Sequence, residues 1–178
     1  MRNLNKLKIL NPELENKIKE MIRLYYNKNR YDLQKHYGDL LKQVSDKINN
    51  IRSLEELDLE EFVKPNGICE GIAIGMDFKK SQFRKFYNEI KNIKIKINKL
   101  HKEQDTSELI SIAIKIISLI PKLAYSKGRG LIDNNFFKFM KVIIGKLREK
   151  LNKENFEVFD KILESILAYH TYYNPKEN

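Results

Sequence analysis

The stretch "SQFRKFYNEIKNIKIKINKL", residues 81–100, carries apolar side chains at the spacing of an α-helix. Residues three and four positions apart lie on the same helical face, so this spacing predicts one buried stripe and a charged outer face. We therefore predict a strongly basic helix over residues 81–102, with Ser81 as its cap. The apolar positions of the stripe are Phe83, Phe86, Tyr87, Ile90, Ile93, Ile97 and Leu100.

The same helical period continues through most of the chain, and little of it alternates with the period of two that is typical of strands. Asn11 before Pro12 is typical of a helix start, and Ser53 with Glu56 forms a capping-box pattern. The sequence therefore predicts an all-α fold: a compact bundle of about five to seven helices in a single domain over residues 1–178. The further helices are expected over 11–26, 31–51, 53–63, 105–128 with a kink at Pro121, 133–151 and 153–172.

Two apolar segments carry expectations about packing. "GICEGIAIG" (67–75) places three glycines four residues apart, which predicts close approach between helices, with Cys69 in the core. "LISIAIKIISLI" (109–120) is apolar on almost every side, so we expect it at the centre of the bundle. A membrane span needs roughly 20 apolar residues, and this run is shorter.

Several classes of function have no support in the sequence. The single cysteine excludes an internal disulfide, and the N-terminus has no apolar signal-peptide core, so we expect a cytoplasmic protein. The histidines at 36, 101 and 170 lack metal-ligand spacing, and no phosphate-binding loop or hydrolase motif is present. We therefore predict no catalytic residue, no metal site and no cofactor, and do not expect an enzyme.

Positive charge is concentrated in two segments of the chain, whose formal net charge is +10. Residues 79–102 contain nine Lys or Arg and one Glu, and residues 122–148 contain seven Lys or Arg and one Asp. Such local excess is typical of a protein with a polyanionic partner.

The predicted basic helix gathers cations at its N-terminal end, where the backbone is already positive. A phosphate bound there would meet free backbone N–H groups and several cations, which would make the cluster favourable. The candidate phosphate-binding residues are Lys79, Lys80, Arg84, Lys85 and Lys91 in the first segment, and Lys122, Lys127 and Arg129 in the second.

Three blocks of the chain resemble the signature segments of a known family, the small subunits of type III-A CRISPR effector (Csm) complexes. The blocks are "SQFRKFYNEI" (81–90), "IPKLAYSKGR" (120–129) and "FDKILESILAYHTYY" (159–173). Their order and separation match the family as well. The resemblance thus covers a core over 68–178, whereas residues 1–67 read as variable N-terminal helices.

The resemblance implies a non-catalytic helical subunit that takes part in antiviral defence without contact to a membrane. The implied partners are crRNA, target RNA, the Csm backbone subunits, the large Cas10-type subunit and further copies of the small subunit. By matched position, the implied RNA-facing residues are Gln82, Arg84 and Lys85 in the first block, and Lys122 and Arg129 in the second.

Two other classes of function remain open from the residues alone. A helix-turn-helix DNA-binding regulator would explain the charge, but it needs a polar recognition helix, and 81–102 carries Lys and Ile there instead. A helical protein-interaction module with a lysine-rich surface is the second alternative.

Overall fold

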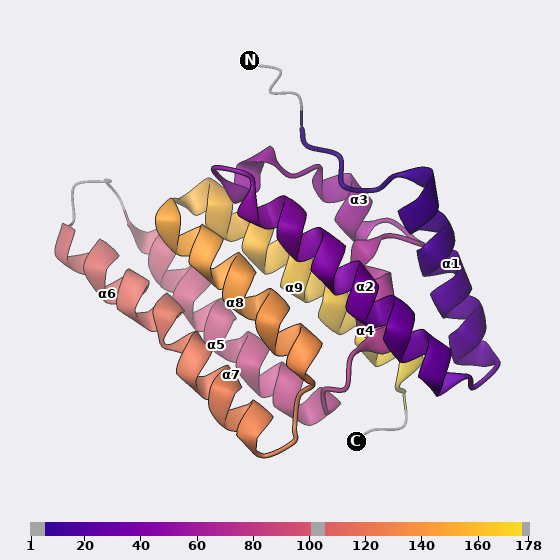
Figure 1. Ribbon diagram of the computed structural model, residues 1–178. Coiled ribbons are helices and arrows are strands. Elements are labelled where there is room, and N and C mark those ends of the chain that lie inside the picture. The colour runs from indigo at the N-terminus through magenta and orange to yellow at the C-terminus, as the bar shows by residue number, and fades with distance from the viewer. Residues whose placement is uncertain (1–5, 101–105, 176–178) are drawn as a thin grey trace.

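The computed structural model describes residues 6–100 and 106–175, which form nine α-helices, one short 3-10 helix and no β-strand (Figure 1). Seven of the nine α-helices contain ten or more residues, so the predicted all-α bundle is confirmed. The elements are α1 (Pro12–Tyr26), α2 (Arg30–Asn49), η1 (Leu54–Glu56), α3 (Leu59–Val63), α4 (Ile68–Gly75), α5 (Lys80–Lys99), α6 (Thr106–Ile117), α7 (Leu119–Gly128), α8 (Asn134–Glu149) and α9 (Lys153–Tyr173).

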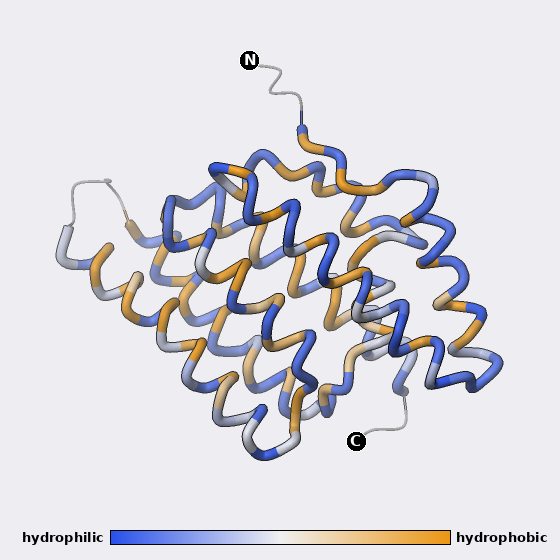
Figure 2. The backbone as a smooth tube through the Cα atoms, viewed as in Figure 1, coloured by the Kyte–Doolittle hydropathy of each residue, from blue (hydrophilic) through white to orange (hydrophobic). Residues whose placement is uncertain are grey.

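The last helix, α9, is the element around which the others pack. It contacts α3, α4, α5, α8 and η1, while α2 packs against α1, α4 and α8 (Figure 1). α6 and α7 lie against α8, and α6 also contacts α5. Apolar positions recur turn by turn along the long helices (Figure 2), and they meet in one continuous core. Its largest fully buried aromatic side chains are Tyr37, Phe62, Phe83, Phe136, Phe139, Phe156 and Phe159.

Two glycines let α4 lie directly against its neighbours. A Cβ atom on Gly71 would come within 2.7 Å of Leu40 Cδ2, and one on Gly75 within 2.4 Å of Tyr37 Cδ2. Real Cβ atoms do not approach other atoms so closely, so the structural role predicted for these glycines is confirmed. Cys69 between them is fully buried, as predicted, and this burial raises the pKa of its thiol.

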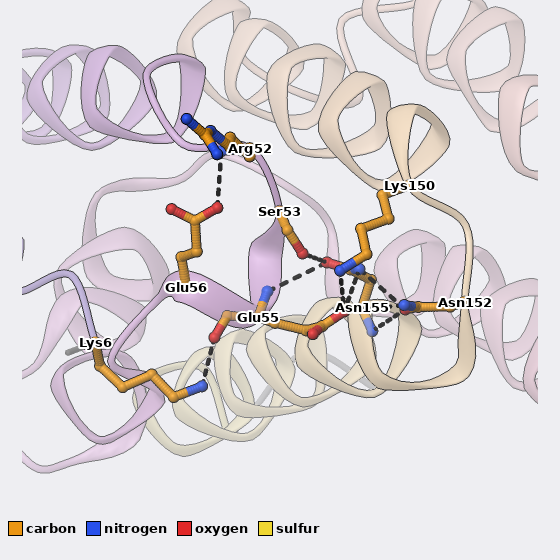
Figure 3. Close-up of polar contacts among 8 residues, drawn as sticks. All are labelled: Lys6, Arg52, Ser53, Glu55, Glu56, Lys150, Asn152 and Asn155. Carbon is orange, nitrogen blue, oxygen red and sulfur yellow. Dashed lines mark hydrogen bonds and ion pairs between the residues drawn. The ribbon is translucent and has the colours of Figure 1, made fainter. Parts of the chain in front are cut away.

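The capping box predicted at Ser53 is wrong. Ser53 caps no helix; its Oγ donates instead to Asn155 Oδ1 at 2.8 Å, and Glu56 accepts from the backbone N–H of Arg52 at 3.0 Å (Figure 3). The helix at this point is only the single turn η1, and α3 begins after a different cap, Asp58. The local pattern was outcompeted by a tertiary hydrogen bond, which the sequence spacing does not reveal.

Glu55 joins the N-terminal half of the chain to the start of α9 (Figure 3). Its Oε1 accepts from Asn155 Nδ2 at 2.7 Å and from Asn152 Nδ2 at 3.0 Å, and it lies 3.2 Å from Lys150 Nζ. Burial raises the pKa of Glu55, whereas hydrogen bonds from Asn152 and Lys150 lower it. The hydrogen bonds outweigh the burial, so the pKa of Glu55 lies below its usual value. The carboxylate is therefore the form that holds this junction together.

The prediction that 109–120 is a buried central helix is wrong. α6 and α7 form an outer layer (Figure 1), with Ile110 55% and Ile114 58% exposed. Only Ile112 and Ile116 of α6 are buried. The kink predicted at Pro121 occurs three residues earlier, since α6 ends and α7 begins on either side of Ser118 and Pro121 lies in the first turn of α7. Residue 105, at which this helix is predicted to begin, lies outside the described residues.

Together, α6 and α7 (Thr106–Gly128) are long and apolar enough to cross a membrane by length and composition. One such segment is weak evidence for a span. Here it bends at Ser118, carries Lys115 and Lys122, and packs one side onto α8. We therefore describe it as a pair of surface helices.

We expect Gly75→Ala to destabilise the protein by about 1–3 kcal/mol, because the new methyl group collides with the buried Tyr37 ring. Gly145 is the matched control: it lies inside α8 with no atom within 4 Å of an added Cβ. Gly145→Ala should stabilise the helix by about 0.5–1 kcal/mol. Urea unfolding followed by circular dichroism measures both changes, and equal shifts for the two variants would contradict this packing.

Candidate nucleic-acid interface

The basic helix begins one residue earlier than predicted, and Ser81 is not its cap. α5 starts at Lys80 with Lys79 at the cap position, where the backbone N–H groups of Gln82 and Phe83 donate to the Lys79 carbonyl at 2.9 and 3.0 Å. The first turn has neither a capping side chain nor an acidic residue. Lys79 is exposed at this end and Gln82 is half-buried.

The prediction that Lys80 binds phosphate is wrong, because its side chain is buried. Its side chain is only 4% exposed, and Nζ donates to the carbonyl oxygens of Asn174 at 3.2 Å and Pro175 at 3.4 Å. The ammonium group therefore ties the start of α5 to the segment after α9. Burial against these carbonyls makes Lys80 a structural residue and removes it from the candidate interface.

A buried carboxylate fixes the rotation of α5 on α9. Asp160 of α9 accepts a hydrogen bond from Tyr87 Oη at 3.0 Å and forms an ion pair with Lys94 Nζ. Burial, together with the negative charge of Asp160, raises the pKa of Tyr87, and the hydrogen bond to Asp160 raises the pKa of Lys94. These contacts hold the apolar stripe of α5 inward.

The same rotation places Arg84, Lys85 and Lys91 on the outer face of α5. All three side chains are exposed. Arg84 and Lys85 have no hydrogen bond or ion pair with any residue in 6–100 or 106–175. Lys91 Nζ lies 5.1 Å from the centre of the Tyr87 ring, a cation–π contact that leaves its charge facing solvent.

The two basic segments lie side by side. α6 and α7 return along α5 (Figure 1), and Lys122 of α7 forms an ion pair with Glu89 of α5, 33 residues away in sequence. Both side chains are partly exposed, so the contact bridges the two helices at the surface. Glu89 is the one acidic residue in 79–102.

A groove with a volume of about 310 Å³ runs beside this ion pair, between α5 and the junction of α6 and α7. Lys96 of α5 and Lys115 of α6 approach each other next to it, and the neighbouring Lys96 lowers the pKa of Lys115. Two ammonium groups held together repel each other, and an anion between them would relieve this repulsion. The groove is lined by Glu89, Asn92, Ile93, Lys115, Ser118 and Lys122.

Arg129 lies on the same side of α7 as Lys122. The two residues are seven positions apart, which at about 100° per residue leaves them within about 20° of each other. Arg129 is exposed at the end of α7, and its guanidinium carbon lies 5.6 Å from the centre of the Tyr125 ring.

Lys127 points to another flank, toward α8. Its Nζ donates to Asn134 Oδ1 at 2.6 Å and lies 5.0 Å from the centre of the Phe137 ring. Lys141 approaches the same ring at 5.8 Å. Lys127 is therefore separated from the other candidates of its segment.

We name the resulting surface the basic seam. Its cations come from three helices, which makes it suited to hold a chain of negative charges along the line between α5 and α7. Sequence reasoning missed Lys96 and Lys115, because only the packing of α6 on α5 brings them together. The basic seam consists of Arg84, Lys85, Lys91 and Lys96 of α5 with Lys115 of α6, Lys122 of α7 and Arg129 at the end of α7; Arg84 and Lys91 lie at its edge nearest α9, since Lys91 contacts the ring of Tyr87, which binds Asp160.

Nothing in the described part of the chain adds reactive chemistry to this surface. Within 6–100 and 106–175, no group of three His, Cys, Asp or Glu side chains is placed to hold a metal ion. The thiol of Cys69 is buried in the core, away from solvent. The basic seam therefore offers binding by charge and hydrogen bonding.

The chain matches a known protein family. The family model described as Csm2 Type III-A matches residues 66–176 of this chain, which is more than half of its length. No curated protein and no solved structure matches the chain.

Lys80→Ala should lower the free energy of unfolding by about 1–3 kcal/mol, because it removes charged hydrogen bonds from a buried position. The neighbouring Lys79→Ala, at an exposed position, should change it by less than about 0.5 kcal/mol. Thermal or urea unfolding checks the difference, and equally mild effects would show that Lys80 does not hold the end of α9.

Proposed function

The chain belongs to the Csm2 type III-A family and is a small subunit of a type III-A CRISPR effector complex, and we propose that its basic seam binds the RNA backbone there. The single observation that carries this proposal is the approach of the two basic segments, joined by Lys122 and Glu89. Cations from separate parts of the chain form one surface, whose shape suits a ribose-phosphate chain.

The proposed binding does not read the base sequence. Lys and Arg contacts to phosphates fix position and orientation, while pairing between guide and target supplies specificity. Arg84 and Lys85 have no hydrogen bond or ion pair with the described residues, so their charges can meet the phosphates of an RNA of any base sequence. Gln82, half-buried in the first turn of α5, would add a hydrogen bond.

Within the complex, we propose a non-catalytic role in the cytoplasm. Membership of the family makes the chain part of a Csm complex with other subunits. The finer assignments are crRNA and target RNA as the ligands, packing along the backbone subunits, contact with the large subunit, and several copies of this chain arranged in succession. The all-α fold and the exposed outer layer of α6 and α7 are compatible with such packing.

The double variant Arg84→Glu with Lys85→Glu should abolish RNA binding by the isolated protein, because it reverses two unpaired charges of the basic seam. Wild-type binding of a labelled single-stranded RNA should weaken steeply between about 50 and 200 mM salt, by about 0.7 in log–log slope for each phosphate bound. Fluorescence anisotropy over a salt series measures both quantities.

The matched control is Lys42→Glu with Lys47→Glu on α2, which makes the same change in net charge at two exposed lysines. This control should retain most of the wild-type slope. If both double variants lose binding equally, the effect comes from net charge, and the assignment to the basic seam fails. Absence of RNA binding by the wild type even at low salt would favour the protein-interaction module, and a DNA consensus from selection would favour the helix-turn-helix regulator.

Glu89→Gln should strengthen RNA binding and steepen the salt dependence by about 0.7 in slope, because Lys122 gains freedom to meet a phosphate. Glu157→Gln on α9 is the matched control, since it removes one negative charge from an exposed position elsewhere. The same anisotropy titration compares the two, and an equal gain from both variants would contradict a local role for Glu89.

A further inference from the structure

We propose that Tyr125 and Arg129 form a stacking position for an unpaired nucleobase at one end of the basic seam. This inference rests on the proposed RNA binding and extends it, since it assigns a contact to a base where the basic seam itself contacts only phosphates. The ligand class is a single-stranded nucleotide whose base is free to leave its neighbours.

The aromatic ring at this position is accessible to solvent. Tyr125 is 66% exposed, although it belongs to a helix whose leucines, Leu119 and Leu123, are buried. The guanidinium carbon of Arg129 lies 5.6 Å from the ring centre, and Arg129 Nη1 donates to Tyr125 Oη at 3.4 Å. The ring and the planar cation thus hold each other in place, which lowers the entropy lost when a base stacks on them.

The backbone around this pair leaves room for a ligand. Gly128 and Gly130 flank Arg129, and an added Cβ on either would meet no atom within 4 Å. Gly130 adopts a φ of +67°, which favours glycine and ends the helix in a tight turn. A base approaching the ring from this side would therefore meet no side chain at the two glycine positions.

The position is continuous with the basic seam. Tyr125 follows Lys122 by three residues and precedes Arg129 by four, so all three lie within about 60° on one side of α7. Lys122 contacts Glu89 of α5, which sets this side of α7 toward α5. A strand whose phosphates follow the basic seam would pass within reach of the ring.

Tyr125 and Arg129 would bind a nucleobase by stacking, and stacking does not distinguish one kind of base from another. Every nucleobase has a π face, so stacking on tyrosine tolerates sequence, and an arginine plane adds a cation–π contact. The pair would distinguish an unpaired nucleotide from a base-paired one, because a paired base already has both faces covered by its neighbours.

The test compares two ligands with equal numbers of phosphates: an oligouridylate of about ten nucleotides and an abasic ribose-phosphate oligomer of the same length. The wild-type protein should bind the oligouridylate about 5- to 100-fold more tightly than the abasic oligomer. Tyr125→Ala should remove this difference, while its salt slope on either ligand stays that of the wild type. Tyr125→Phe should keep the preference for bases, because the ring remains.

Two further variants separate stacking from charge and from simple apolar contact. Tyr125→Leu keeps apolar volume without a ring and should behave as Tyr125→Ala does. Arg129→Lys keeps the positive charge but removes the planar guanidinium group. It should reduce the preference for the oligouridylate over the abasic oligomer and leave the salt slope unchanged. Because Tyr125 is exposed, circular dichroism should show wild-type helicity in every variant.

The outcomes distinguish the two proposals. Equal affinity of the wild type for both oligomers, with a steep salt slope, would overturn the stacking position and leave backbone binding intact. Equal loss for Tyr125→Phe and Tyr125→Ala would also overturn stacking, since the hydroxyl would then be the essential group. Failure of the wild type to bind either oligomer at low salt would overturn both proposals together.

Discussion

The contact that the rest of the surface depends on is the one between Asp160 of α9 and two residues of α5, Tyr87 and Lys94. A buried carboxylate must be satisfied by hydrogen bonds or ion pairs, so α5 can be rotated on α9 in only one way. That rotation buries Phe83 and Ile90 and turns Arg84 outward. The position of the basic surface therefore depends on the hydrogen bond and ion pair that Asp160 makes in the core, and not only on the number of Lys and Arg residues.

Much of the fold follows from local rules that the sequence shows directly. The helical period of residues 81–100 predicts both the helix and its buried stripe, and Asn11 before Pro12 marks the start of α1, where Leu14 N–H donates to the Asn11 side chain at 2.8 Å. Gly71 and Gly75 indicate close packing because no larger residue fits at that contact. These signals depend on the residue itself or on its neighbours within one turn.

The candidate site was less predictable, because it depends on which helices become neighbours. Lys79 and Lys80 are adjacent and chemically identical, yet Lys79 is exposed and Lys80 is buried against the backbone carbonyl groups that follow α9. Lys115 lies in a segment whose local charge is negative, and only its approach to Lys96 reveals a role. The apolar composition of α6 likewise did not predict that the face with Ile110 and Ile114 is exposed. The spacing of apolar residues does not specify how many other helices pack against a helix.

The order of the helices along the chain also bears on how the protein is made. The apolar stripe of α5 packs against α9, which comes later in the chain than every other described helix. Until residues 153–175 leave the ribosome, the side of the stripe that packs on α9 has no cover, and Lys80 lacks the carbonyl groups of Asn174 and Pro175. These contacts of α5 can therefore form only after residues 153–175 have been synthesised, and nascent chains that stop before α9 would leave part of the apolar stripe exposed, which favours aggregation or chaperone binding.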